Sequence, residues 1–170
     1  MILKSIIIFI SFFTLIPCEK CVGQSSLQID LDHIVDISRT NLAFEVEYLK
    51  VGKAIDITFW EHGCDMRKPL ERTLSIERNP DSYTISFCEL KRKMTCDDLI
   101  PIMNEFERSL LLMDPAKSCT TTHKVAIQNN YAVYLGIDAS CDWKGFTILT
   151  KAIFNVLPHE PVNKTCLKDW

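Results

Sequence analysis

The chain has 170 residues, of which 47% are hydrophobic and 24% are charged, and its formal net charge at pH 7 is −3. This length is sufficient for one domain with a substantial hydrophobic core. Because the charge is mildly acidic and well mixed along the chain, the composition gives no indication of a nucleic-acid partner.

The N-terminal segment is typical of a secretion signal. A positive charge precedes an apolar run from residue 5 to residue 16. This run is shorter than the roughly 20 residues that a membrane-spanning helix needs. Small residues favour cleavage after Gly23, and cleavage after Cys18 is the alternative. We therefore expect a signal peptide over 1–23 and a single secreted domain over 24–170.

Six of the eight cysteines lie beyond this leader: Cys64, Cys88, Cys96, Cys119, Cys141 and Cys166. An even set of cysteines in a secreted chain is most simply a disulfide framework. Cleavage after Gly23 leaves this even number, whereas cleavage after Cys18 would leave seven cysteines and one unpaired thiol. The sequence thus predicts an extracellular protein with disulfide bonds, and it leaves their connectivity open.

Alternation of apolar and polar residues with period two predicts β-strands through most of the chain. In the first half, strand candidates lie at 27–31, 44–48 and 55–59. A less regular candidate follows at 70–78, and another spans Ser82–Cys88 after a turn with proline. We expect these segments to place one face in a core and the other in water.

One segment departs from this pattern and predicts an amphipathic helix. Its apolar residues recur at spacings of three and four and therefore share one stripe: Leu99, Met103, Phe106, Leu110 and Met113. Two aspartates at 97–98 can cap its start, and an Asp-Pro pair at 114–115 ends it.

Strand candidates resume after this helix. Val125 and Ile127 begin one of them, and two longer candidates span Tyr131–Ala139 and Phe146–Leu157. Turn-forming residues between the last two predict that they form a closing hairpin.

The motifs that mark common catalytic and metal sites are absent from the sequence. There is no Gly-x-Ser-x-Gly or His-Glu-x-x-His motif, and five glycines leave little material for a phosphate-binding loop. A zinc site that uses His62 and Cys64 is the alternative to a disulfide, but cysteines of secreted proteins usually pair. We therefore expect no enzyme activity, no cofactor and no metal.

The strands carry many large apolar side chains, among them Phe44, Phe59, Phe87 and Phe154. One interpretation is the ordinary core of a β-sandwich. The other is that two sheets stay apart and enclose a space for an acyl chain. Periodicity does not separate the two, because both place the same residues inward.

The order of landmarks in the second half resembles a known superfamily. A strand ending in Phe87-Cys88, a helix, Ser118-Cys119 and a Tyr-bearing strand at Tyr131–Gly136 follow one another. This order is similar to that of the MD-2-related lipid-recognition superfamily, which includes GM2-activator-like proteins and related insect secreted proteins with chemosensory members. The likeness covers roughly Ile55–Val156.

The resemblance implies a mainly β protein: an immunoglobulin-like antiparallel β-sandwich with one amphipathic helix, crosslinked by disulfides. It implies a disulfide between Cys88 and Cys119 and a lipid or other hydrophobic ligand held between the sheets without catalysis. The ligand-binding residues expected on this basis are Phe44, Phe59, Phe87, Phe106, Leu135 and Phe154.

Two functions follow as hypotheses. The first is a secreted carrier or presenter of a lipid or other hydrophobic small molecule, with chemosensation as one setting. The alternative is a secreted interaction protein, such as a signal, toxin or receptor antagonist, with a solid core and a protein partner. The basic run Lys91–Lys93 makes a membrane surface or a receptor a further candidate partner, although short charge runs are usually just solvated. Asn163 begins an acceptor sequence for N-linked glycosylation.

Overall fold

The computed structural model describes residues 34–63 and 69–158. Its centre is a seven-stranded sheet of order β1-β7-β6-β2-β3-β4-β5. The strands are β1 (Ile34–Asp36), β2 (Ala54–Gly63), β3 (Leu70–Arg78), β4 (Tyr83–Phe87), β5 (Leu90–Met94), β6 (Thr121–Gln128) and β7 (Val133–Asp138). The helices are the short 3-10 helix η3 (Ile37–Arg39), α1 (Leu42–Glu47), α2 (Cys96–Leu110) and α3 (Gly145–Phe154). Neighbouring strands are antiparallel, except that β1 runs parallel to β7.

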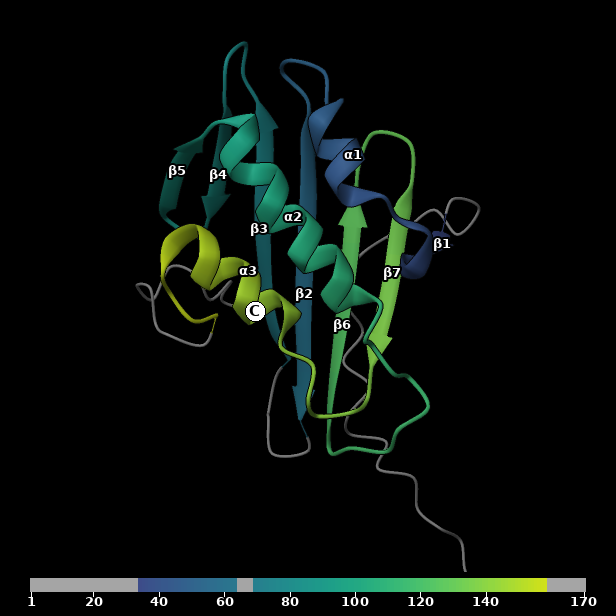
Figure 1. Cartoon of the computed structure of the whole chain (residues 1–170). Coiled ribbons are helices and arrows are strands. Elements are labelled where there is room, and N and C mark those ends of the chain that lie inside the picture. Colours follow the sequence, from purple (N-terminus) through teal and green to yellow (C-terminus); the bar gives the residue numbers. More distant parts are fainter. Residues whose placement is uncertain (1–33, 64–68, 159–170) are drawn as a thin grey trace, which may run out of the picture.

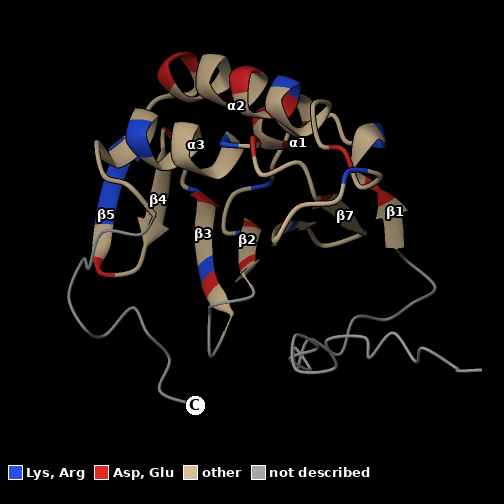
Figure 2. Ribbon diagram, turned by 90° about the horizontal axis from the view of Figure 1, so that it is seen from below, with Lys and Arg blue, Asp and Glu red and all other residues tan. Residues whose placement is uncertain are grey.

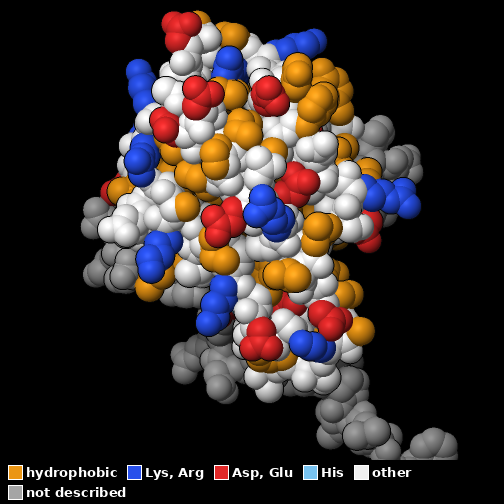
Figure 3. All heavy atoms as spheres, viewed as in Figure 1, with side chains coloured by type: hydrophobic (Ala, Val, Ile, Leu, Met, Phe, Trp, Pro, Cys, Tyr) orange, Lys and Arg blue, Asp and Glu red, His pale blue; other side chains and the backbone are white. Residues whose placement is uncertain are grey.

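The three α-helices cover one face of this sheet (Figures 1 and 2). The prediction of a mainly β fold with a disulfide is confirmed. The second sheet of a sandwich is not found among the described residues, where helices form the layer that packs on the sheet. Figure 3 shows charged side chains of both signs mixed over this helical face.

The buried face of the sheet follows from the alternation in its central strands. Ile57 on β2 lies opposite Leu74 on β3 and Ile127 on β6, and all three are fully buried. Their neighbours along β2, Asp56 and Thr58, point to the other face and are less buried. Burial of each large apolar side chain stabilises the fold by about 1.5–3 kcal/mol, so this row is the main attachment surface for the helices.

The predicted amphipathic helix is confirmed as α2. Its buried residues include Leu99, Met103, Phe106 and Leu110 from the predicted stripe. It begins earlier than the stripe because Thr95 caps it: the Thr95 hydroxyl accepts a hydrogen bond from the Asp98 amide at 3.2 Å and donates to the Asp98 carboxylate at 2.8 Å.

The strand predicted at 44–48 is wrong, because this segment belongs to α1. The side chain of Asn41 caps the helix by accepting a hydrogen bond from the Phe44 amide at 3.3 Å. Leu42 and Val46, four residues apart, are both fully buried. Phe44 lies on the outer side and is 54% exposed, which reverses the expectation that it points inward.

The strand predicted at 146–157, and with it the closing hairpin, is also wrong. Residues 145–154 form α3, in which Phe146, Leu149 and Ile153 are buried at spacings of three and four. Threonines and isoleucines in this segment favour a strand by intrinsic propensity. Packing of the helical stripe against the sheet outweighs that propensity, which is a weak prior in a folded domain.

The basic run Lys91–Lys93, predicted to be solvated next to a turn, is part of strand β5 at the edge of the sheet. Its side chains are exposed, and Arg92 donates a hydrogen bond to the carbonyl of Ile153 on α3. Lysines suit an edge strand because their charge discourages pairing with another chain.

Several predictions fall outside the described residues. They are the signal peptide over 1–23, the strand at 27–31, the glycosylation site at Asn163, and the cysteines Cys64 and Cys166.

Replacement of Phe106 by Ala tests the role of α2. Phe106 is fully buried and does not line the pocket described below, so we expect loss of about 3–5 kcal/mol in the free energy of unfolding, measured by urea denaturation. Leu112→Ala is the control, because Leu112 is 76% exposed and should change stability by about 0.5 kcal/mol or less. Equal effects of the two changes would contradict this packing.

Candidate functional site

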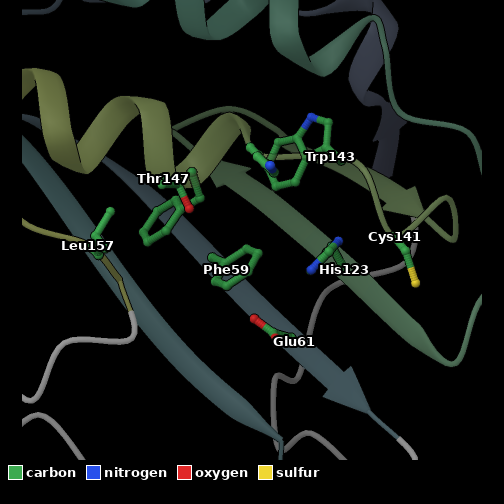
Figure 4. A pocket seen from close by; sticks show the side chains of 9 residues that line it. Phe59, Glu61, His123, Cys141, Trp143, Thr147 and Leu157 are labelled. Carbon is green, nitrogen blue, oxygen red and sulfur yellow. The ribbon is translucent and has the colours of Figure 1, made fainter.

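A pocket of about 360 Å³ lies between α3 and the ends of β2 and β6. It is lined by Phe59, Glu61, His123, Cys141, Trp143, Lys144, Phe146, Thr147 and Leu157 (Figure 4). These residues come from β2, from β6, from the loop after β7, from α3 and from the segment after α3. The fold therefore assembles the pocket from parts that are far apart in the sequence.

Aromatic rings form the apolar wall of this pocket. Phe59 on β2 stacks on Phe146 of α3, with ring centroids 4.9 Å apart and planes within 7°. Trp143 and His123 flank Phe59 at centroid distances of 6.2 Å and 5.7 Å. All four side chains are buried, so their rings are held in place before any ligand arrives.

Trp143, in the loop before α3, is anchored to helix α2. Its indole Nε1 donates a hydrogen bond to the carbonyl of Ser109 on α2 at 2.7 Å. The close packing also requires glycine at position 145, where a Cβ atom would lie 2.3 Å from both Trp143 and the Ser109 hydroxyl. The loop that carries Trp143 is thus tied to α2 as well as to α3.

The buried carboxylate of Asp138 positions His123. Asp138 accepts hydrogen bonds from the Asp114 amide at 3.0 Å and from the Ser140 amide and hydroxyl at 3.1 and 3.0 Å. His123 Nδ1 lies 3.5 Å from Asp138 Oδ2. Burial raises the pKa of Asp138, but the hydrogen bonds from Asp114, Ser140 and His123 outweigh it and keep the pKa below its usual value of 3.8. An ionised Asp138 therefore holds the ring of His123 and two loops together.

A disulfide closes the same end of the molecule. Cys119, just before β6, pairs with Cys141 in the loop after β7, with Cα atoms 5.7 Å apart. The Cys88–Cys119 bond implied by the family resemblance is therefore wrong, although Cys88 is also disulfide-bonded. The reason is the strand order: β3 and β2 separate β4, which ends beside Cys88, from β6.

Cys96 carries a free thiol, to which the Tyr83 hydroxyl donates at 3.8 Å.

The predicted ligand-binding residues do not form one site. Phe59 lines the pocket. Phe87 and Phe154 do not line it, and their ring centroids lie 6.1 Å apart. Phe106 is enclosed in the core beneath α2, and Phe44 packs on Tyr48 at the surface.

Leu135 lies on the face of the sheet opposite Phe59. The register places Gly136 of β7 beside Val125 of β6 and so on the same face as Phe59. Its neighbour Leu135 therefore points the other way. The alternation in β7 was predicted correctly, but the sequence does not indicate which of its two faces meets the helices.

Apart from Phe59, the residues that line the pocket were not predicted as ligand-binding residues, and His123, Trp143 and Lys144 are three of them. His123 did carry a signal, because it precedes Val125 and Ile127 at the same period of two and so belongs to the inward row of that strand. Trp143 and Lys144 were assigned to a hairpin turn, and nothing local indicates that they begin a helix over a pocket.

Within 34–63 and 69–158, no three or more His, Cys, Asp or Glu side chains are grouped so that they could hold a metal ion. In the same ranges, no helix has the length and apolar character required to cross a bilayer. No family model, curated protein or solved structure matches this chain. A function must therefore be inferred from the pocket itself.

Replacement of Asp138 by Asn should change the pH dependence of stability. Because the folded pKa of Asp138 is below 3.8, its ionised form stabilises the fold above about pH 4, and this stabilisation is lost as the pH falls through the folded pKa. Asp138→Asn should lower the free energy of unfolding at pH 7 by roughly 1–3 kcal/mol and reduce the further loss between pH 7 and pH 3. Urea denaturation at both pH values measures this.

The control for this change is Asp142→Asn, an exposed side chain in the same loop. It should leave the stability loss between pH 7 and pH 3 as in the parent protein. The same acid-induced loss in Asp138→Asn and in the parent would show that Asp138 does not contribute in this way.

Removal of the Cys119–Cys141 disulfide should destabilise the protein. In the chain-entropy model, a disulfide that closes a loop of this length stabilises the folded state by roughly 3 kcal/mol. The double variant Cys119→Ser/Cys141→Ser should therefore unfold at a lower urea concentration than the parent. Cys96→Ser is the control, since its thiol is free, and should cost about 1 kcal/mol or less. Peptide mapping without reduction provides a direct check, and a recovered Cys88–Cys119 peptide would refute the pairing.

Proposed function

We propose that this chain is a secreted, non-enzymatic protein that binds a small hydrophobic ligand in the pocket beneath α3. The pocket is the observation that supports this proposal. Its aromatic wall of Phe59, Trp143 and Phe146 offers apolar contact, and its rim has a few polar groups. A volume of 360 Å³ with mainly apolar walls and a few placed polar groups is typical of small-molecule sites.

The ligand site proposed here differs from the space between two sheets that the family resemblance implies. It lies between one sheet and α3, at the end where the sheet is least covered by α1 and α2 (Figure 1). Its size suits a small molecule or one short chain rather than a whole phospholipid. Of the six residues predicted from the resemblance, Phe59 keeps its role.

The chemistry of the lining supports binding rather than nucleophilic catalysis. The sulfur of Cys141 is held in a disulfide and cannot act as a thiolate. His123 has Asp138 beside it, as a general base often has, yet this carboxylate also holds two loop amides and a hydroxyl. These contacts explain the His123–Asp138 pair by a structural role, which is to hold the two loops.

Secretion is a further part of the proposal. It is supported by the apolar N-terminal segment of the sequence and by the Cys119–Cys141 disulfide, because disulfides persist mainly in oxidising compartments. A carrier of this kind would suit chemosensation, among other settings outside the cell.

The alternative function, a secreted interaction protein, has one observation in its favour. Large apolar side chains are exposed at the end of the molecule around α1: Phe44 at 54%, Tyr48 at 66% and Val51 at 60%. Figure 3 shows hydrophobic side chains gathered over this helix. Exposed aromatic groups of this kind are enriched where proteins contact one another.

A pocket-filling substitution tests the ligand-binding proposal. Thr147→Trp should fill the pocket and weaken binding of decanol, a neutral apolar probe, by at least about tenfold in isothermal titration calorimetry. Ile148→Trp is the matched control, because Ile148 is the next residue of α3, is 39% exposed and does not line the pocket. Its decanol affinity should equal that of the parent.

Native mass spectrometry of the purified protein, before and after organic extraction, provides an independent measurement. Loss of a bound small mass on extraction is expected from the parent and not from Thr147→Trp. Equal decanol binding by Thr147→Trp and the parent would overturn the proposal in favour of the interaction protein.

A further inference from the structure

We infer that the ligand of this pocket is an amphipathic anion, with a carboxylate head against His123, Lys144 and the first turn of α3 and an apolar body against the aromatic wall. This inference rests on the proposed ligand-binding function and specifies the chemical class of the ligand. It is carried by the polar groups that converge on one side of the pocket.

His123 supplies a ring nitrogen at the pocket. Its side chain is 11% exposed, and its Nδ1 lies 3.5 Å from Asp138 Oδ2. Nε2 has no hydrogen-bond partner among the described residues, and Figure 4 shows the ring beside Phe59 and Glu61 at the pocket. A ligand atom that hydrogen-bonds to Nε2 would contribute to affinity.

His123 can pair with an anion in its imidazolium form. With Asp138 at Nδ1, the neutral ring donates from Nδ1 and can only accept at Nε2, whereas the imidazolium donates from both nitrogens. A carboxylate head at Nε2 therefore pairs with the imidazolium.

Lys144 and the start of α3 add positive potential at the same place. Lys144 precedes α3, lines the pocket and has an exposed side chain. No side chain caps this helix, so its first amide groups keep unsatisfied donors and the positive end of the helix dipole. Phe146 and Thr147, in the first turn, also line the pocket.

Glu61 is the one lining group that opposes an anion. It sits directly across from His123 in the β2–β6 register and lines the pocket. Asp138 is fully buried and hydrogen-bonded to two loops, so it acts on the ligand only through His123. Lys144, the α3 terminus and the imidazolium form of His123 favour a negative head, whereas Glu61 opposes it.

Three probes with the same ten-carbon chain separate the charge of the head from apolar burial: decanoate, decanol and decylammonium. Isothermal titration calorimetry of the full oxidised protein at pH 6 should give decanoate an affinity at least about tenfold above that of decanol, with decylammonium the weakest.

Variants assign this preference to the named groups. Lys144→Gln should weaken decanoate binding by about five- to tenfold and leave decanol binding unchanged. The matched control is Lys151→Gln, which replaces an exposed lysine in the last turn of α3. It should change the binding of neither probe. His123→Gln should weaken decanoate binding more than decanol binding. Glu61→Gln should strengthen decanoate binding.

The outcomes distinguish this inference from the proposed function. Equal affinities for decanoate and decanol, or a preference for decylammonium, would overturn the anion while leaving the ligand-binding function intact. No binding of any probe would overturn both. A decanoate preference that survives both Lys144→Gln and His123→Gln would place the head elsewhere and also overturn the inference. If His123→Gln fails to fold, Lys144→Gln decides, because Lys144 is exposed and not part of the core.

Discussion

The structure depends on the burial of one face of its sheet. The inward row of β2 begins with Ile55, Ile57 and Phe59, and the row of β6 contains Ile127 and Val125. Such a surface is unstable in water, and the three helices remove it from solvent. At the far ends of these rows the next inward residues are polar, namely Glu61 on β2 and His123 on β6. The pocket lies where the apolar face gives way to polar side chains, so its apolar wall and its polar rim have the same origin.

The pocket is held by the contacts that hold this end of the fold. Asp138 joins β7, His123 on β6 and two loops, and Trp143 joins the loop before α3 to α2 through Ser109. The Cys119–Cys141 disulfide closes the loops on the outside. These contacts hold the rings of the pocket in place before binding, so the side chains of the protein lose less entropy when a ligand binds. Stability and the proposed binding are therefore properties of one cluster of residues.

Prediction from the sequence was most successful where a pattern was strong over its whole length. The strands around Ile57 and Ile85 and the helix α2 follow from periodicity, and the less regular candidate at 70–78 is also a strand, β3. It failed at α1 and α3, where branched and aromatic residues imitate strand alternation over a few residues. In α3, Phe146, Leu149 and Ile153 fit a helix equally well, and only contact with the sheet and α2 selects between the two.

The sequence alone determined the mainly β class, the single amphipathic helix that begins near two aspartates, and one residue of the pocket wall, Phe59. These depend on local periodicity, which a chain carries in itself. Tertiary structure decided the helical layer on the sheet, the pairing of Cys119 with Cys141, and the meeting of His123 with Asp138 and Lys144. These depend on strand order and on which face of each strand is buried, and both arise from contacts between residues far apart in the chain.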